Sequence, residues 1–441
     1  MDVEDFGQQL PELRTPPPGP RSRASAERLA EVESRNVTYV ADDWPVFWAD
    51  ALGSNVRDVD GNVFLDLTSA FGVAFLGHRP PVLEAALREE TLVHGMGDIH
   101  PPQRKLELLE RLASIAPFDE AKTILANTGS EAVEAALKTA SLATGRPGVI
   151  AFEGGYHGLT LGSLSATERE HFRGPFRAAT YAGVSFLPFP STDDADALVR
   201  FDRALAGGAP NGDAIGAVLI EPVQARGGVR LPPSELMAEI GARARAAGAL
   251  VVADEIFTGL GRCGDWFASP TVGLTPDIVC IGKTLGAGLP ISACLAPARV
   301  MDAWPTSTGE AVHTSTFLGH PLACGAALRA LETIEREGLA SRAAEMGRAW
   351  VEALRSAIGD RPSVREIRGL GLLIGIEFQR PDGSGDGLGA SVARRLLSRG
   401  LIVLPAGDRG EVLELSPAVT ITKDQTDFAV EAIADVVREL D

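Results

Sequence analysis

Six short apolar runs between residues 122 and 296 constrain the fold of this chain more than any other feature. Each run is too short for a typical helix and is mostly apolar, so each predicts a strand buried on both faces of a sheet. The runs are Lys122–Ala126, Gly148–Phe152, Ala217–Ile220, Ala249–Ala253, Asp277–Ile281 and Ile291–Ala296. Helical spacing of apolar residues in Ser130–Leu142 and Ser234–Ala247 indicates amphipathic helices between them. Strands that alternate with helices predict an α/β fold with a mostly parallel, doubly wound sheet.

The pattern changes after about residue 325, where long helices alternate with a few short strands. The predicted helices are Leu322–Arg336, Leu339–Ile358 and Leu388–Ser398, and the predicted strands lie near Gly369–Phe378 and Val412–Leu415. This pattern indicates a second, smaller α+β domain that N-terminal residues complete. There we expect a helix near Ala24–Arg35 and strands joined by a tight turn within Ser54–Asp66. The expected organisation is an extended, Pro- and Arg-rich arm at 1–24, the first part of the small domain at 25–75, the large domain at 76–325 and the rest of the small domain at 326–441.

Charge and cysteine content narrow the class of partner and the compartment. The 441-residue chain has a formal net charge of −18, which argues against DNA or RNA because a nucleic-acid-binding protein needs a basic face. The N-terminus, MDVEDFGQQL, lacks the basic and apolar stretches of a secretory signal, and no apolar run is long enough for a transmembrane helix. None of the four cysteines lies in a CxxC pair or at metal-ligand spacing from another Cys or His. We therefore expect a cytoplasmic protein with buried free thiols, no metal site and no membrane partner.

The first candidate site residues follow a predicted strand directly, because ligands of open parallel sheets bind at the carboxyl ends of the strands. Asn127-Thr128-Gly129-Ser130-Glu131 lies between a strand and a helix. Gly129 allows a tight turn, and Ser130 is a natural N-cap that leaves backbone N–H groups to bind an anion such as phosphate. Taken alone, these residues are better explained by simple helix capping.

Two further strand ends carry an aromatic ring and polar side chains. In the segment EGGYHG, the glycines allow Tyr156 to stack on a flat cofactor with His157 nearby, although similar aromatics occur in ordinary loops. In the segment IEPVQ, Glu221 and Gln224 emerge where an apolar strand ends. Gln224 is expected either to donate a hydrogen bond to a phenolate oxygen or, with Glu221, to anchor the loop.

Asp254 and Lys283 are the most informative pair, because each follows a strongly apolar strand. A buried aspartate is costly unless it is paired, and a protonated pyridine nitrogen is one suitable partner. A partly desolvated lysine has a lowered pKa and forms a Schiff base with an aldehyde, whereas a lysine that extends to the surface would have no such function. Together with a phosphate cradle and a stacking aromatic, the pair is what pyridoxal 5'-phosphate (PLP) needs.

At this point the sequence resembles the class III aminotransferases, which include the 4-aminobutyrate, acetylornithine and ornithine aminotransferases. The resemblance is carried by LVVADEIFTGLGRCG (residues 250–264) and PDIVCIGKTLGAGLP (residues 276–290), and family-like segments extend from Asn55 to Ile421. It implies the PLP-dependent transferase fold type I, with a large domain and a smaller α+β domain. It also implies a homodimer with its active sites at the subunit interface.

The resemblance implies a role for each matching residue. Lys283 would form the Schiff base with PLP and transfer a proton during the reaction, and Asp254 would bind the pyridine nitrogen. The other implied cofactor-binding residues are Gly129 and Ser130 at the phosphate, Tyr156 and Ile256 on the two ring faces, Gln224 at the ring hydroxyl with Glu221 and His157 nearby, and Thr316 reaching the phosphate of the neighbouring subunit.

Two residues depart from the family pattern at the expected substrate entrance. Glu414 stands where these enzymes usually have an arginine that binds the substrate carboxylate, and Arg226 stands where they have a gating glutamate. We expect a charge-swapped pair in which Arg226 binds a carboxylate or Glu414 binds a cationic donor. A structural ion pair without a substrate role is the alternative. Phe71 matches an apolar pocket residue of the family.

The expected function is therefore a PLP-dependent aminotransferase that moves an amino group from an amino acid or amine donor to a 2-oxo acid acceptor. Two alternatives remain open from sequence. One is an amino-acid racemase or epimerase, or a decarboxylase, of the same family. The other is a non-catalytic protein that retains the fold, against which the presence of both Lys283 and Asp254 argues.

Overall fold

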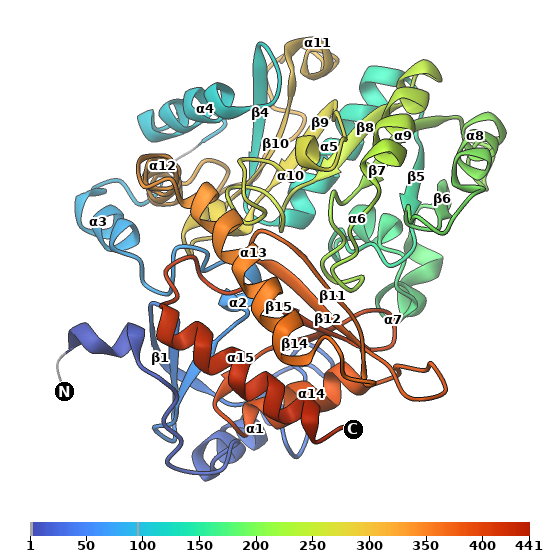
Figure 1. Ribbon diagram of the computed structural model, residues 1–441. Coiled ribbons are helices and arrows are strands. Elements are labelled where there is room, and N and C mark those ends of the chain that lie inside the picture. Colours follow the sequence, from blue (N-terminus) through green and yellow to red (C-terminus); the bar gives the residue numbers. More distant parts are fainter. Residues whose placement is uncertain (1–2, 95–96) are drawn as a thin grey trace. The chain divides into compact units, whose positions relative to one another are not determined.

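The computed structural model describes residues 3–94 and 97–441 and divides into two compact units (Figure 1). We call Pro81–Ala344 the central unit, and the residues up to Pro80 together with Glu345–Asp441 the terminal unit. The central unit extends beyond the limit of 325 expected for the large domain. The reason is that helix α12 (Pro321–Arg336) packs against α3 (Pro81–Glu89) and α4 (Gln103–Ile115) of the central unit.

The central unit contains a seven-stranded sheet in the order β4-β10-β9-β8-β7-β5-β6 (Figure 1). Its strands are β4 (Ala121–Ala126), β5 (Gly148–Phe152), β6 (Val184–Leu187), β7 (Ile215–Ile220), β8 (Leu250–Asp254), β9 (Ile278–Ile281) and β10 (Ser292–Pro297). Strands β6, β5, β7, β8 and β9 pair in parallel, whereas β10 is antiparallel to both of its neighbours, β9 and β4. The prediction of a mostly parallel sheet is confirmed. The six apolar runs correspond to six strands, and the short edge strand β6 was not predicted.

Short helices and turns connect the strands of the central unit. Besides α3, α4 and α12, its helices are α5 (Gly129–Thr144), α6 (Leu161–Ala166), α7 (Glu170–Arg173), η2 (Gly174–Ala179), α8 (Ala197–Gly207), α9 (Ser234–Ala246), α10 (Ala268–Thr271), η3 (Lys283–Gly286) and α11 (Ala298–Met301). The apolar face of α5 packs on the sheet, with Ala132, Val133 and Ala136 buried against residues such as Leu219 and Val252. Small alanines on α5 allow the helix to lie close to the strands.

The terminal unit is an α+β assembly with two four-stranded sheets. One sheet has the order β1 (Trp48–Leu52), β2 (Asn55–Asp58), β3 (Val63–Asp66) and β13 (Leu401–Ile402). The other has the order β11 (Val364–Leu370), β12 (Leu373–Phe378), β15 (Val412–Leu415) and β14 (Leu404–Ala406). The helical elements are η1 (Val3–Gln8), α1 (Pro20–Val32), α2 (Ser69–Gly72), α13 (Leu339–Ile358, in this unit from Glu345 on), α14 (Leu388–Leu397) and α15 (Lys423–Arg438). The core between sheet and helices includes Leu354, Ile376, Leu396, Leu413 and Val436.

The N-terminal segment, expected to be an extended arm at residues 1–24, makes backbone contacts with the first sheet of the terminal unit. Within its described part, the backbone N–H groups of Arg14 and Thr15 donate to Oδ1 of Asn62, over 2.7 and 2.9 Å. Glu12 forms an isolated bridge with Val63 of β3. Helix α1 also begins earlier than expected, at Pro20, because proline suits the first turn of a helix.

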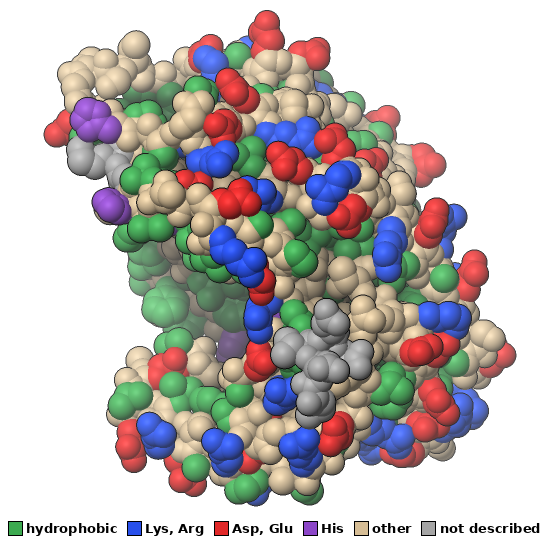
Figure 2. Space-filling view, turned by 90° about the vertical axis from the view of Figure 1, so that its left-hand side faces the viewer, with side chains coloured by type: hydrophobic (Ala, Val, Ile, Leu, Met, Phe, Trp, Pro, Cys, Tyr) green, Lys and Arg blue, Asp and Glu red, His purple; other side chains and the backbone are tan. Residues whose placement is uncertain are grey.

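Two surface properties bear on possible partners. The face shown in Figure 2 has Lys and Arg side chains interspersed with Asp and Glu, and no basic stripe lies on it. None of the helices among the described residues combines the length and apolarity that a membrane-spanning helix needs.

Candidate active site

The candidate residues of the central unit converge at the carboxyl edge of its sheet. Asp254 ends β8, Lys283 follows β9 after one glycine, and Glu221 follows β7 directly. The segment EGGYHG follows β5, and Asn127 follows β4. Because β5, β7, β8 and β9 run parallel, and β4 runs in their direction through β10, these strand ends meet at one edge. This edge is where ligands of open α/β sheets bind.

Asp254 is buried, with 4% of its surface exposed, and both of its carboxylate oxygens have donors. Oδ2 lies 2.8 Å from Nδ1 of His157, and Oδ1 accepts a hydrogen bond from the backbone N–H of Ile256 over 3.1 Å. Burial alone would lower the pKa of His157, but the hydrogen bond and charge of Asp254, together with the charge of Glu221, raise it above its ordinary value. His157 therefore keeps its proton to higher pH and holds the Asp254 carboxylate in a fixed orientation.

Lys283 adopts an unusual backbone conformation at the start of η3. Its φ of +42° lies in the left-handed region, which a residue with a Cβ rarely occupies. Its Nζ lies 3.7 Å from the centroid of the Phe257 ring, a cation–π contact with a buried residue of the loop that follows Asp254. The amine is thus directed to the Asp254 loop rather than extended to solvent. Backbone strain of this kind concentrates at functional sites.

The segment that follows β4 forms a tightly packed helix start. The N-cap of α5 is Thr128, not Ser130 as predicted, and Thr128 and Glu131 form a capping box. Thr128 precedes the first helical residue with an extended backbone, and this conformation defines the N-cap position. Ser130 instead lies in the first turn, where its Oγ accepts a hydrogen bond from the N–H of Leu159 over 3.0 Å. The first backbone N–H groups of α5 have no partner within the helix and suit a phosphate.

Two glycines are required for the close packing around this helix start. A Cβ at Gly129 would lie 2.9 Å from Cδ1 of Ile256, and a Cβ at Gly158 would lie 2.0 Å from Oγ of Ser130. The Asp254 loop and the EGGYHG loop therefore meet α5 only because these positions lack side chains. Pyridine, amine and phosphate partners are thus brought to one place, and the residues present fit PLP.

Tyr156, Glu221 and Gln224 form a second layer of the site, in which Glu221 and Gln224 are buried and Tyr156 is half-buried. Oε1 of Glu221 accepts from the N–H of Tyr156 over 2.9 Å, and burial raises the pKa of Glu221 to about 7, against the opposing charge of His157. Nε2 of Gln224 donates to the carbonyl oxygen of Glu153 over 2.9 Å, while its buried Oε1 has no hydrogen-bond partner among the described residues. Gln224 thus anchors the loop through its amide N–H and has an unpaired carbonyl oxygen among the described residues.

Arg226 lies beside this layer. Burial raises the pKa of Tyr156, and the nearby positive charge of Arg226 opposes that rise. The carbonyl oxygen of Arg226 accepts a hydrogen bond from Arg169 over 3.0 Å, which fixes the backbone of its loop. The side chain of Arg226 is half-buried, and its positive charge acts on Tyr156, the residue that is predicted to stack on the cofactor.

The remaining predicted residues belong to a loop of the central unit or to the terminal unit. Thr316 is exposed on the loop before α12. In the terminal unit, Phe71 is 54% exposed within α2, a turn with left-handed backbone at Ser69, Ala70 and Phe71. Glu414, 1% exposed, accepts a hydrogen bond from Oγ of Ser416 over 3.4 Å. Because Arg226 belongs to the central unit, its pairing with Glu414 stays a prediction.

Comparison with known proteins identifies the class to which this site belongs. The family model for class-III aminotransferases matches residues 38–437. The chain is 33% identical to the acetylornithine aminotransferase of Methanothermobacter thermautotrophicus, over 94% of this chain and 100% of that protein. It is 29% identical to the alanine/serine racemase of Pyrococcus horikoshii, over 100% of this chain and 95% of that protein. It superposes on an ornithine aminotransferase from Toxoplasma gondii with partial PLP occupancy, with a TM-score of 0.81, 29% identity and 94% coverage of each chain.

These matches define a PLP-dependent enzyme that catalyses transamination. The chain belongs to the class III aminotransferase family, and the resemblance noted in the sequence is confirmed.

Proposed function

We propose that Lys283 is the catalytic residue of this aminotransferase and that Asp254 sets the charge of the cofactor ring. The observation that carries this proposal is that both side chains leave adjacent parallel strands, β9 and β8, at the same edge of the sheet. When bound, PLP supplies an electron sink for the carbanion that forms at the substrate α-carbon. The protein must then orient the substrate, move the α-proton and hold the ring in one position.

Each described residue has a distinct task in this proposal. The Lys283 amine attaches the cofactor and, once released, takes and returns the proton of the substrate α-carbon. The Asp254 carboxylate, oriented by His157, opposes the positive charge of a protonated pyridine nitrogen. The N–H groups at the start of α5, with Ser130, hold the phosphate. Tyr156 and Ile256 would pack on the two faces of the ring, and an N–H of Gln224 would donate to its hydroxyl oxygen.

The transamination and racemisation alternatives differ in what the enzyme releases. The similarity to the alanine/serine racemase, at 29% identity over 100% of this chain, makes racemisation the specific second candidate. Single amino donors should be incubated with cofactor-loaded enzyme in the absence of a 2-oxo acid acceptor. An aminotransferase is expected to release about one equivalent of 2-oxo acid per site and then stop. Inversion of the α-carbon without release of oxo acid would instead establish the racemase.

We further propose that Arg226 binds a carboxylate of the substrate. The influence of its positive charge on Tyr156 supports this role, because a substrate attached to a cofactor under Tyr156 would lie within the range of that charge. Glu414 would then meet a cationic group of the donor, as expected for a charge-swapped pair.

Substitution of Arg226 by alanine is expected to raise KM for carboxylate-bearing substrates by about 10- to 100-fold with a small change in kcat. A hydrogen bond to a charged group contributes this much binding free energy. Because the bond would be equally strong in the ground state and the transition state, its loss raises KM and leaves kcat nearly unchanged. Steady-state kinetics with an amino acid and with an amine that lacks a carboxylate would measure it. The exposed Arg177 provides a matched control, since Arg177→Ala should leave both constants unchanged. Unchanged KM values in Arg226→Ala would contradict the role.

We also propose a homodimer in the cytoplasm. The central unit exposes large apolar side chains on and near α3 and α4 and on the loop before α12, and exposed apolar patches mark protein interfaces. They are Leu87, Leu92, Val93, Ile99, Leu106, Val312 and Phe317. The four cysteines are buried free thiols, which supports a reducing compartment.

Substitution of Phe317 by glutamate is expected to weaken this dimer. Phe317 is 61% exposed, so a charge there should be tolerated by the isolated chain but not in an apolar interface. Sedimentation velocity should show a shift toward monomer over a concentration range in which the parent chain remains dimeric. Phe176→Glu, at a residue 54% exposed on η2, is the control and should not alter the mass. A parent chain that sediments as a monomer would refute the dimer itself.

A further inference from the structure

The loop formed by residues 305–320, which carries Thr316, is anchored to the central unit at several points. We call it the Thr316 loop. Thr316 and Phe317 are exposed, whereas Gly319 is buried and Ser315 and His313 are partly buried. The loop thus turns its anchoring residues inward and presents Thr316 outward. The anchors determine where the Thr316 hydroxyl lies.

The first anchor connects the Thr316 loop to the phosphate cradle of the same chain. Nδ2 of Asn127 donates to Oγ of Ser315 over 3.2 Å. Asn127 directly precedes the capping box of α5, and its own backbone N–H donates to Oε2 of Glu131 over 2.7 Å. Asn127 is therefore fixed by the same carboxylate that caps the helix. Through its hydrogen bond to Ser315, it also fixes the residue next to Thr316.

The second anchor is Lys105 of α4. Its Nζ donates to the carbonyl oxygen of Gly97 over 2.5 Å. Gly319 has a φ of +75°, and a Cβ there would lie 2.6 Å from Cδ of Lys105, so the loop backbone rests on the lysine stem. A Cβ at Gly97 would lie 2.0 Å from the carbonyl oxygen of Leu318. Three segments therefore interlock on the C-terminal side of Thr316.

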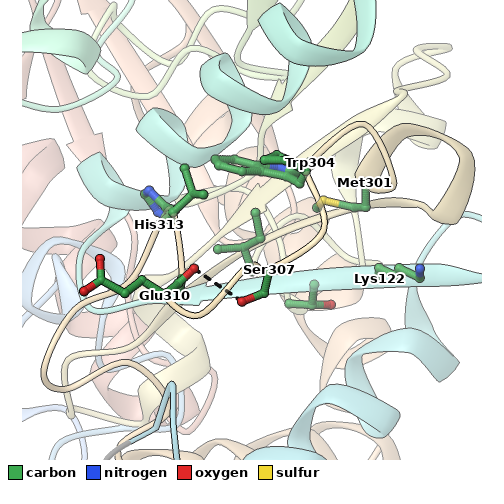
Figure 3. A pocket seen from close by; sticks show the side chains of 11 residues that line it. Lys122, Met301, Trp304, Ser307, Glu310 and His313 are labelled. Atoms are coloured by element: carbon green, nitrogen blue, oxygen red, sulfur yellow. Dashed lines mark hydrogen bonds between the residues drawn. The ribbon is translucent and has the colours of Figure 1, made fainter.

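The third anchor holds the N-terminal side of the loop. Nδ1 of His313 lies 3.3 Å from Nζ of Lys138 on α5, and the His313 ring faces that of Trp304 at a centroid distance of 5.6 Å (Figure 3). Nε1 of Trp304 in turn donates to Oγ1 of Thr139 on α5 over 2.9 Å. With these contacts, α5 supports the Thr316 loop along its length as well as forming the cradle at its own start.

We infer that Asn127 and Ser315 are positioning residues that set the cofactor affinity of the partner subunit's site. The inference rests on the proposed dimer and on the contact of Thr316 with the neighbouring subunit's phosphate that the family resemblance implies. One chain then uses the segment Asn127–Ser130 twice, as the cradle for its own cofactor and as the support for the residue that it lends to its partner. The two cofactor sites of a dimer are thereby linked through a hydrogen bond within each chain.

Mixed dimers test this inference, because they separate effects on a chain's own site from effects on its partner's site. One chain carries Lys283→Ala and cannot attach the cofactor, so borohydride traps PLP only on the Lys283 of the other chain. The half-saturating PLP concentration for trapping is then measured with Ser315→Ala on either chain. On the Lys283→Ala chain, Ser315→Ala is expected to raise that concentration about fivefold, the usual effect of losing a neutral hydrogen bond. On the Lys283 chain it should have no effect.

A double-mutant cycle on the Lys283→Ala chain isolates the hydrogen bond itself. Asn127→Ala and Ser315→Ala should each weaken PLP binding at the other chain's site, and the double variant should be no worse than either. Ser315→Thr keeps the hydroxyl and should restore the parent half-saturating PLP concentration. Thr316→Ala removes the phosphate contact itself and should show the largest rise in that concentration. If Ser315→Ala acts only on its own chain's site, or on neither, the inference is overturned although the dimer stands. If the parent chain does not dimerise, the proposed dimer fails and this inference fails with it.

Discussion

Substitution of Lys283 by alanine is expected to lower kcat for transamination by at least about 10³-fold. The variant loses the amine that attaches the cofactor and the group that moves the substrate proton, and general acid–base catalysis alone contributes about 10²- to 10⁴-fold. Lys283→Ala should also bind no cofactor that borohydride can trap. Single-turnover kinetics and mass spectrometry of the reduced protein measure the two effects.

Two control variants distinguish loss of the Lys283 amine from loss of its positive charge and from damage to the fold. Lys283→Arg keeps a cation above the ring of Phe257 and should fold normally, yet it should be as inactive as the alanine variant. Lys122→Ala removes a half-exposed lysine paired with Asp302 and should retain activity within about twofold, as surface ion pairs contribute little. Trapping of PLP on Lys283→Ala at parent levels would show that another lysine is the attachment point.

Substitution of Asp254 by asparagine should lower kcat by about 10²- to 10³-fold while leaving the fold in place. Asparagine has the same shape and still accepts the hydrogen bond of the Ile256 N–H, but it lacks the charge that opposes a protonated ring nitrogen. Loss of one preorganised electrostatic group usually costs a rate factor of this size. Pre-steady-state rates of the first half-reaction at saturating PLP would measure the change.

Asp277→Asn is the matched control for this variant. Asp277 is as buried as Asp254 and accepts a hydrogen bond from the N–H of Val251 over 3.0 Å, but it precedes β9 and so lies at the opposite edge of the sheet. Its substitution should reduce the free energy of unfolding without changing kcat of the loaded enzyme. Equal loss of kcat in both variants would indicate that Asp254 has only a structural role.

The Asp254→Asn variant should also change how stability depends on pH. Asp254 raises the pKa of His157 in the folded protein, so the pair stabilises the fold below the unfolded pKa of histidine, about 6.5. That contribution is lost as the pH rises through the higher folded pKa. Denaturant unfolding at a series of pH values should show this decline in the parent chain and a weaker one in Asp254→Asn.

The central sheet could be predicted from sequence because each buried parallel strand is a continuous apolar run. A run such as Gly148–Phe152 is recognisable as a strand from its own residues, without knowledge of the strand that it pairs with. Strands β6, β13 and β14 were missed because they are short, and β6 and β13 also owe their pairing to distant segments. The antiparallel direction of β10 was also beyond sequence reasoning, since an apolar run carries no information on the direction of its neighbours.

The site residues could be predicted individually, and their contacts could not. Asp254 and Lys283 were found because a charged residue at the end of an apolar strand is costly without a function. The cap at Thr128 was misassigned to Ser130 because either hydroxyl satisfies the same sequence pattern at the start of the helix. The contacts of Lys283 with Phe257 and of Asn127 with Ser315 depend on side-chain direction, which spacing along the chain does not specify.

The position of β10 has a consequence for the order in which the enzyme is assembled during synthesis. The strand that leads to the phosphate cradle, β4, joins the sheet only through β10, with Ala126 paired to Ser292. A nascent chain that has emerged as far as Lys283 therefore contains both the amine and the cradle but has no strand to bring them together. Such long-range closure is slow relative to local folding. A ribosome-bound chain is expected to retain PLP only after Pro297 has left the exit tunnel.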